Sequence, residues 1–213
     1  MDSPPEEAAG KWVKGSDLRT AEACDYASLI SIIDDLSFVV LSATRILKEM
    51  EAGELDEDAS VVVRGLWSAA LVAYKRCFSD GKRAFLSEDD VQSLSLKGDV
   101  VEWHRFVVQM RNKHIAHSVN PFEEVRVALF LDDDRNVLGA GPLMMKHVSG
   151  DQQTVWQLGA LASQILDVIR QRASDQLDAL LAAAREMEPE ALARLKPLEL
   201  TVPGAEQAGT ART

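Results

Sequence analysis

The residues best suited to chemistry lie in one short segment of this 213-residue chain, which reads Arg-Asn-Lys-His-Ile-Ala-His from Arg111 to His117. Histidine exchanges a proton near neutral pH, so His117 can act as a general acid or base. The guanidinium of Arg111 can bind a phosphate and stabilise negative charge that develops on its oxygens. Cleavage of RNA by its own 2′-hydroxyl needs both functions, because one proton must leave that hydroxyl and another must reach the departing 5′-oxygen.

The spacing of this segment resembles the signature of the HEPN superfamily. In that signature an arginine is followed, after a short gap, by a histidine, and often by Asn, Asp or His directly; here Asn112 follows Arg111, and His117 stands six positions on. The resemblance covers the motif closely and the helical part of the chain, from about 18 to 185, loosely. It implies a helical bundle whose two protomers place their Arg–His pairs in a shared cleft and cut RNA without a metal or cofactor.

The resemblance assigns a role to each polar residue around the motif. Arg111 is the expected phosphate clamp, His117 the general acid or base, and Asn112 the residue that orients them. The expected RNA-binding residues are Arg76, Lys82, Arg83, Lys113 and His114. The implied protein is a homodimeric bacterial endoribonuclease of the toxin or phage-defence class, with an RNA substrate and a protein regulator as partners.

A second interpretation of the motif stays open. Six residues correspond to about 120° around a straight α-helix, so Arg111 and His117 converge only if the helix end distorts or if the site forms across a two-fold axis. His114 and His117 also continue an apolar stripe, which is typical of histidines that only contribute to a core. The alternative is therefore a non-catalytic HEPN-like interaction or regulatory module, in which Arg111 pairs with a neighbouring acid.

Metal and nucleotide sites find little support. His114 and His117 have the spacing of one helical turn, with Glu102 and His104 upstream, but the Glu-x-x-His pattern of di-iron bundles is absent. No phosphate-binding loop rich in glycine and ending in lysine occurs. We therefore expect no metal and no cofactor.

The charge of the chain is unevenly distributed. The net charge of −11 argues against a protein that coats nucleic acid in general, because phosphate binding relies on Lys and Arg. Residues 1–58 hold 14 acids and five bases, whereas residues 64–83 hold five bases and only Asp80 as an acid. A local basic surface for RNA, and an acidic N-terminal part suited to a protein partner, are both compatible with this pattern.

Composition indicates a globular protein of the cytoplasm. The N-terminus lacks the basic-then-apolar pattern of a signal peptide, and no apolar run is expected to span a bilayer. Cys24 and Cys77 lie among apolar neighbours, so both are expected to be reduced core thiols. We expect no association with a membrane.

Periodicity predicts a mainly α fold. Helices are expected from about 18 to 52, 58 to 79, 99 to 117 and 152 to 187, with a short helix after Ser87 and a β-hairpin at about 124–146. The first and last helices are long enough to pair, which predicts an antiparallel helical bundle with two long helices and an appended β-hairpin. One domain over 17–196 is expected, between a flexible tail at 1–16 and a disordered tail at 197–213.

Two of these helices have predicted core stripes that matter below. The second helix is expected to bury Val62, Leu66, Ala69, Ala73 and Cys77. The helix that carries the motif is expected to bury Val100, Trp103, Val107 and Met110.

Overall fold

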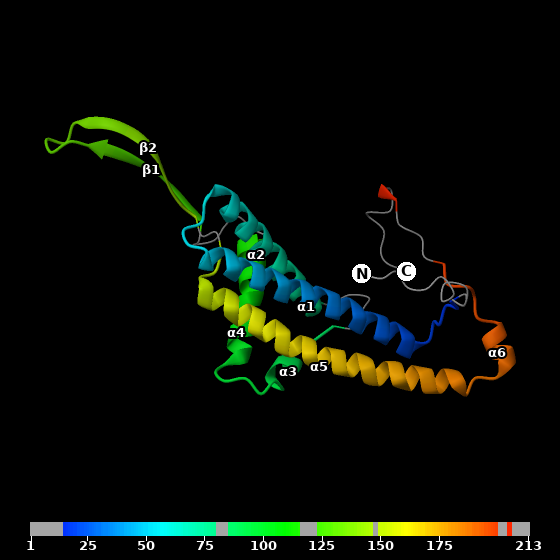
Figure 1. The fold of residues 1–213 in the computed structure, drawn as a ribbon. Helices are drawn as coiled ribbons and strands as arrows, with labels where there is room; N and C mark the ends of the chain where they lie inside the picture. The colour runs from blue at the N-terminus through cyan, green and yellow to red at the C-terminus, as the bar shows by residue number, and fades with distance from the viewer. Residues whose placement is uncertain (1–14, 80–84, 116–122, 147–148, 200–203, 206–213) are drawn as a thin grey trace.

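Three helices form the body of the protein. In the computed structural model, which describes residues 15–79, 85–115, 123–146, 149–199 and 204–205, these are α1 (Ala21–Glu51), α2 (Glu57–Cys77) and α5 (Gln152–Arg185). The shorter elements are α3 (Glu88–Gln92), α4 (Val100–Met110), η2 (Arg111–Ile115), β1 (Glu123–Leu131), β2 (Val137–Lys146) and α6 (Pro189–Ala193) (Figure 1). The mainly α fold with two long helices and one antiparallel hairpin is confirmed.

The two long helices run antiparallel. The Gln176 side chain of α5 donates a hydrogen bond to the Glu22 carbonyl at the start of α1, and Gly159 of α5 lies against Ala43 further along α1. A Cβ atom at Gly159 would lie 3.0 Å from the Ala43 Cβ, so a glycine lets the two backbones approach closely here. Figure 1 shows the pair side by side along most of their length.

Side-chain caps define where the long helices begin. The Thr20 hydroxyl accepts from the Ala23 amide at the start of α1, and carboxylates of Asp56 and Asp151 do the same for α2 and α5. The segment before α1 is held by backbone pairing instead, since the Asp17 amide donates to the Lys196 carbonyl and Ser16 forms a bridge with Pro197. Ser16 and Pro197, which the sequence assigned to the two loose tails, are thus paired with each other.

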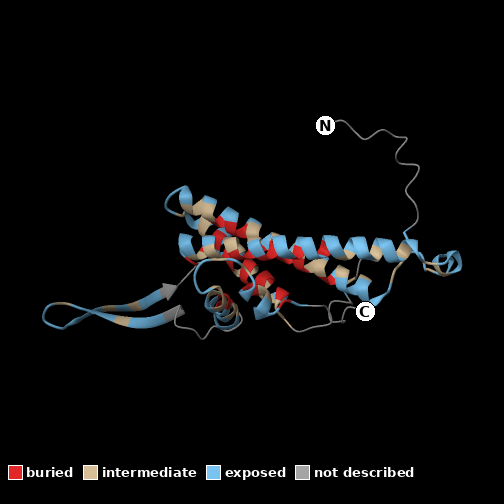
Figure 2. Cartoon of the chain, turned by 90° about the horizontal axis from the view of Figure 1, so that it is seen from below, coloured by how far each residue is buried: buried red, intermediate tan, exposed pale blue. Residues whose placement is uncertain are grey.

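The core lies where α1, α2 and α5 meet, as the buried residues in Figure 2 show. Its largest fully buried side chains include Trp67 and Tyr74 of α2. The stripe predicted for α2 was wrong by one position over its first half: Val63, not Val62, is buried, and Trp67 takes the place expected for Leu66. Burial of the Trp67 side chain removes more apolar area from water than burial of Leu66 would, so it stabilises the fold more.

Two further sequence expectations need correction. Cys77 is buried, but Cys24 is exposed near the start of α1, so it is not a core thiol. In length and composition α1 meets the minimum for a membrane span, although no apolar run was expected to. Helix α1 packs between α2 and α5, which also accounts for its apolar side: 39% of the apolar stretch is buried inside the protein.

The hairpin projects from one end of the bundle as a separate arm (Figure 1). Residues of β1 and β2 pair with each other in antiparallel register, from Glu123 opposite Lys146 to Leu131 opposite Val137, with an irregularity after Phe130. The turn between the strands places Arg135 at a φ of 65°, and Asp132 accepts hydrogen bonds from the backbone and side chain of Asn136. Among the described residues of the hairpin, none is buried (Figure 2).

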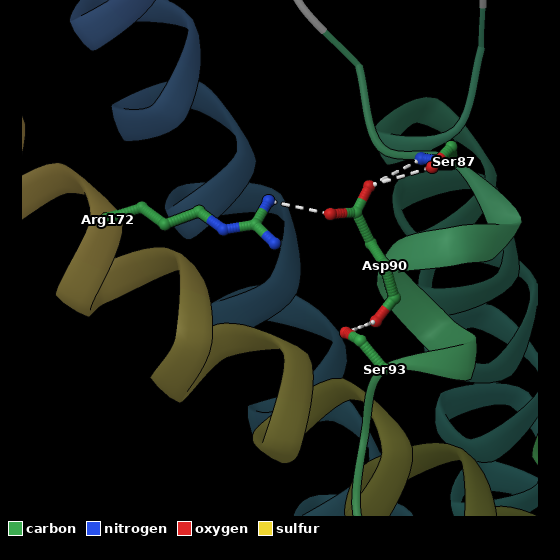
Figure 3. Close-up of polar contacts among 4 residues, drawn as sticks. All are labelled: Ser87, Asp90, Ser93 and Arg172. Carbon is green, nitrogen blue, oxygen red and sulfur yellow. Dashed lines mark hydrogen bonds and ion pairs between the residues drawn. The ribbon is translucent and has the colours of Figure 1, made fainter.

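Short helix α3 ties the motif-bearing helix to the long helices. Asp90 accepts from the Ser87 amide and hydroxyl, and its second oxygen lies 2.6 Å from the Arg172 guanidinium of α5 (Figure 3). Glu88 binds Arg105 of α4 through both of its oxygens, at 3.0 and 2.6 Å. Burial on its own raises the pKa of Asp90, but the Ser87 amide and Arg172 outweigh it and hold that pKa below its ordinary value.

Replacement of Asp90 by Asn should therefore destabilise the fold at neutral pH. Loss of the charged hydrogen bond to Arg172 and of the helix cap should lower the free energy of unfolding by roughly 1–2 kcal/mol. Because the folded pKa of Asp90 lies below the unfolded one, its contribution is present above about pH 4 and is lost as the pH falls further. Denaturant unfolding at pH 7 and pH 3 tests this, with Asp89→Asn as the matched control; equal losses in both variants would contradict it.

Candidate functional site

The backbone changes its helical form where the motif begins. Helix α4 ends at Met110, and residues Arg111–Ile115 continue as a π-helix, η2. The Arg111 amide still donates to the Val107 carbonyl, so the wide turn follows α4 without a break. π-turns inside helices are rare and are often found at functional sites. The described part of the motif, Arg111–Ile115, thus departs from the geometry of a straight α-helix.

Arg111 is half-buried at the start of this turn. It follows Val107 by one helical turn, and Val107 is buried against the bundle, so Arg111 extends the inward side of α4. Its Nη1 donates to the Asn112 side-chain oxygen at 3.2 Å. Within the part of the chain that the structure describes, no carboxylate lies at ion-pair distance from Arg111, whereas Arg105 and Arg172 each bind one.

Only some of the expected RNA-binding residues lie in the part of the chain that the structure describes. Lys113 is exposed on η2, next to Asn112, which is also exposed. His114 belongs to η2, but its side chain is not described. His117, Lys82 and Arg83 lie outside the described residues, so their predicted roles stay predictions.

Arg76 is committed to another contact. Its guanidinium lies 3.4 Å from the carboxylate of Asp35, a buried residue of α1, and 63% of the Arg76 side chain remains exposed. The pair links α2 to α1 and supplies a countercharge for a carboxylate that would be costly to bury alone. Arg76 therefore serves the α1–α2 contact, and any role in binding RNA would have to use its exposed side.

A buried histidine, His104, lies two helical turns before Arg111. Its Nδ1 is 2.8 Å from the Tyr74 hydroxyl of α2, and the Phe78 ring centroid lies 4.4 Å from its own. Burial lowers the pKa of His104, with Lys75 and Arg105 adding to the effect and Glu88 opposing it. Burial also raises the pKa of Tyr74, so its hydroxyl stays protonated; the tautomer of the neutral imidazole sets which of the two groups donates.

Sequence reasoning considered His104 only as part of a metal set and missed this contact. The signal was present, because Val100, His104 and Val107 are spaced by four and three, as residues on one helix face are. Among the described residues, no three His, Cys, Asp or Glu side chains come together to hold a metal ion. His104 is thus a structural residue that fixes α4, and with it η2, against α2.

A sizeable cavity lies elsewhere. It has a volume of about 540 Å³ between the start of α1 and the C-terminal half of α5, and it is lined mainly by apolar residues such as Leu18, Leu180 and Met187. Glu22 is the one titratable residue among those that line it within the described chain. No described residue of the motif lines it, and its described lining lacks the converging polar groups typical of a catalytic pocket.

Tyr74→Phe should destabilise the protein although it removes a single oxygen. The change leaves the buried His104 Nδ1 without its hydrogen-bond partner, which costs roughly 1–3 kcal/mol of unfolding free energy. The double variant Tyr74→Phe with His104→Leu should recover part of that loss, because both polar partners are then gone. Denaturant unfolding of the three variants tests this; a double variant that loses the sum of two single losses would contradict it.

The lowered pKa of His104 predicts that the stability of the protein depends on pH. Between its folded pKa and about 6.5, the unfolded imidazole binds a proton that the folded one does not, so wild-type stability should fall as the pH drops through this range. His104→Gln keeps an acceptor for Tyr74 but cannot titrate, so its loss of stability over the same range should be smaller. Unfolding midpoints at pH 7.5 and 5.5 compare the two proteins; identical slopes would show that His104 is not the group responsible.

Comparison of this chain with protein families, with characterised proteins and with solved structures gives no match. A proposal for its function therefore depends on the arrangement of its own side chains. Within the described residues, that arrangement singles out the π-helical segment that begins at Arg111.

Proposed function

We propose that this chain is a metal-independent endoribonuclease of the HEPN type, of the toxin or phage-defence class. The observation that carries the proposal is the setting of Arg111. It is a half-buried guanidinium on a π-turn, held by Asn112 and without a carboxylate partner among the described residues. An arginine whose charge is not neutralised by the described residues around it is suited to bind an anion such as a phosphate.

The proposed reaction uses the 2′-hydroxyl of RNA as the nucleophile. His117 removes the hydroxyl proton, the 2′-oxygen forms a bond to phosphorus, and the bond from phosphorus to the 5′-oxygen breaks. The leaving 5′-oxygen takes up a proton, so the products are a 2′,3′-cyclic phosphate and a 5′-hydroxyl. Arg111 stabilises the charge that gathers on the non-bridging oxygens, and Asn112 holds the guanidinium in place.

A second protomer completes this site. Because Arg111 and His117 do not share a face of a straight helix, a composite cleft across a two-fold axis is the simplest way to bring both groups to one phosphate. Lys113 and His114, with Lys82 and Arg83, would contact flanking phosphates and draw an anionic substrate to an otherwise acidic protein. We place this activity in the cytoplasm, with a protein regulator acting on the acidic N-terminal part.

A non-catalytic interaction module is the second candidate. The exposed apolar arm formed by β1 and β2 favours it, since large exposed apolar patches mark protein contacts. In this alternative the motif contributes only to packing, and Arg111 binds a carboxylate of a partner instead of a phosphate.

Cleavage of RNA in the presence of EDTA separates the two candidates. Wild-type protein should produce fragments with cyclic phosphate ends, and Arg111→Ala and His117→Ala should each lower the rate by about a hundredfold or more, as loss of a charge-stabilising or proton-transfer group does. Arg185→Ala, which removes an exposed arginine at the far end of α5, is the matched control and should retain full activity.

The outcomes bear directly on the proposal. Wild-type protein that cleaves no RNA in several fresh preparations would favour the interaction module. Activity that persists in both motif variants would place the reaction at a different site. The fold of each variant is verified by its thermal unfolding, so that loss of activity is not mistaken for loss of structure.

A further inference from the structure

The two faces of the β1–β2 arm differ in character. Side chains alternate between faces along each strand, and cross-strand partners share a face. Among residues whose side chains are described, one face, which we call the open face, carries Val125, Val127, Leu129, Leu131, Ala140, Pro142 and Met144, all of them apolar; the register places Glu123 and Lys146 at its base. The other face carries Arg126, Ala128, Phe130, Gly139, Gly141 and Leu143.

The second face is partly covered from within. The Phe130 ring lies over Gly141, where a Cβ atom would be 3.4 Å from it. The open face has no such cover. Large side chains on it are between 46% and 78% exposed: Val125, Val127, Leu129, Leu131 and Met144. The arm extends away from the bundle (Figure 2).

An arm of this kind is not stable in water on its own. A two-stranded hairpin is marginal unless a third strand, a helix or another sheet covers its apolar side. Addition of a strand along the β2 edge is disfavoured, because Pro142 has no amide hydrogen to donate. Face-to-face packing on the open face is a contact that would cover the exposed apolar side chains of the arm.

The size of the open face suits a second copy of the same arm. Its six large side chains offer about 600 Å² of apolar surface, at roughly 100 Å² each. A stable interface takes about 800 Å² from each partner, so the open face supplies most of what is needed. Two identical apolar ribbons are also self-complementary, as a two-fold interface demands.

Charge argues for this partner over a lipid surface. The tip of the arm holds Asp132, Asp133 and Asp134, and hydrogen bonds from Asn136 keep the pKa of Asp132 low, so the tip is anionic at neutral pH. A membrane would have to accommodate these carboxylates beside its headgroups. A second arm can cover the open face while the tip stays in water.

We propose that the chain self-associates through its arm, with the open faces of two copies packed against each other. This goes beyond the ribonuclease proposal and does not rest on it, because it follows from the apolar face alone. It names the surface that would form a dimer, whether or not that dimer is an enzyme.

The test uses two leucines on the same hairpin. Leu129 lies on the open face and is 64% exposed, and Leu143 lies on the opposite face and is 59% exposed. In sedimentation velocity from roughly 1 to 100 µM, wild-type protein should show a dimer that strengthens with concentration. Leu129→Glu should weaken dimerisation by about a hundredfold, because each dimer loses two buried leucines, and Leu143→Glu should change it less than about threefold.

Amide hydrogen exchange provides a second readout. Exchange of β1 and β2 amides should slow as the wild-type concentration rises, and this effect should be lost in Leu129→Glu alone. A wild-type protein that stays monomeric, including one whose arm binds lipid vesicles instead, would overturn the proposal. Equal weakening by the two variants would overturn it as well, because the contact would then not be specific to the open face.

Discussion

The close pairing of α1 with α5 is the constraint on which the rest of the structure depends. The two helices approach closely where Gly159 faces Ala43, and no larger residue fits at Gly159 without a shift. Their shared apolar side forms the surface on which α2 packs, and α2 in turn receives α4. The position of the motif thus depends on a series of helix contacts, which starts with α1 against α5 and continues through α2 to α4.

Polar contacts complete what apolar packing leaves open. Helix α4 is short, and an apolar stripe alone would let it slide or rotate against α2. The hydrogen bond between Tyr74 and His104 and the two-oxygen contact of Glu88 with Arg105 remove that freedom. These directional contacts fix the position of α4 against α2. They therefore set where η2 begins and which side of the helix carries Arg111.

The molecule combines a rigid body with an arm that its own bundle does not support. Apolar area in the bundle is removed from water at the junction of three helices, whereas apolar area on the arm stays exposed. Such an imbalance is unusual for a monomer, because the burial that stabilises a hairpin has to come from somewhere. The ribonuclease and the self-association proposals meet at this point, since a composite active site needs the second copy that the arm is suited to bind.

The sequence by itself determined the elements. Periods of 3.6 and 2 gave the four longer helices and the hairpin, because apolar residues must lie on one side of an element to be buried. It also singled out Arg111 and Asn112, since the signature depends only on residue types along the chain.

Only the tertiary structure decided what each polar residue contacts. It paired Arg76 with Asp35, buried His104 against Tyr74, left Cys24 exposed and turned the buried side of α2 toward Trp67. These outcomes depend on which helix lies beside which, and local periodicity carries no information about neighbours distant in sequence. The π-turn at Arg111 and the separation of the arm from the bundle belong to the same class, because both reflect the space that packing leaves rather than any local preference.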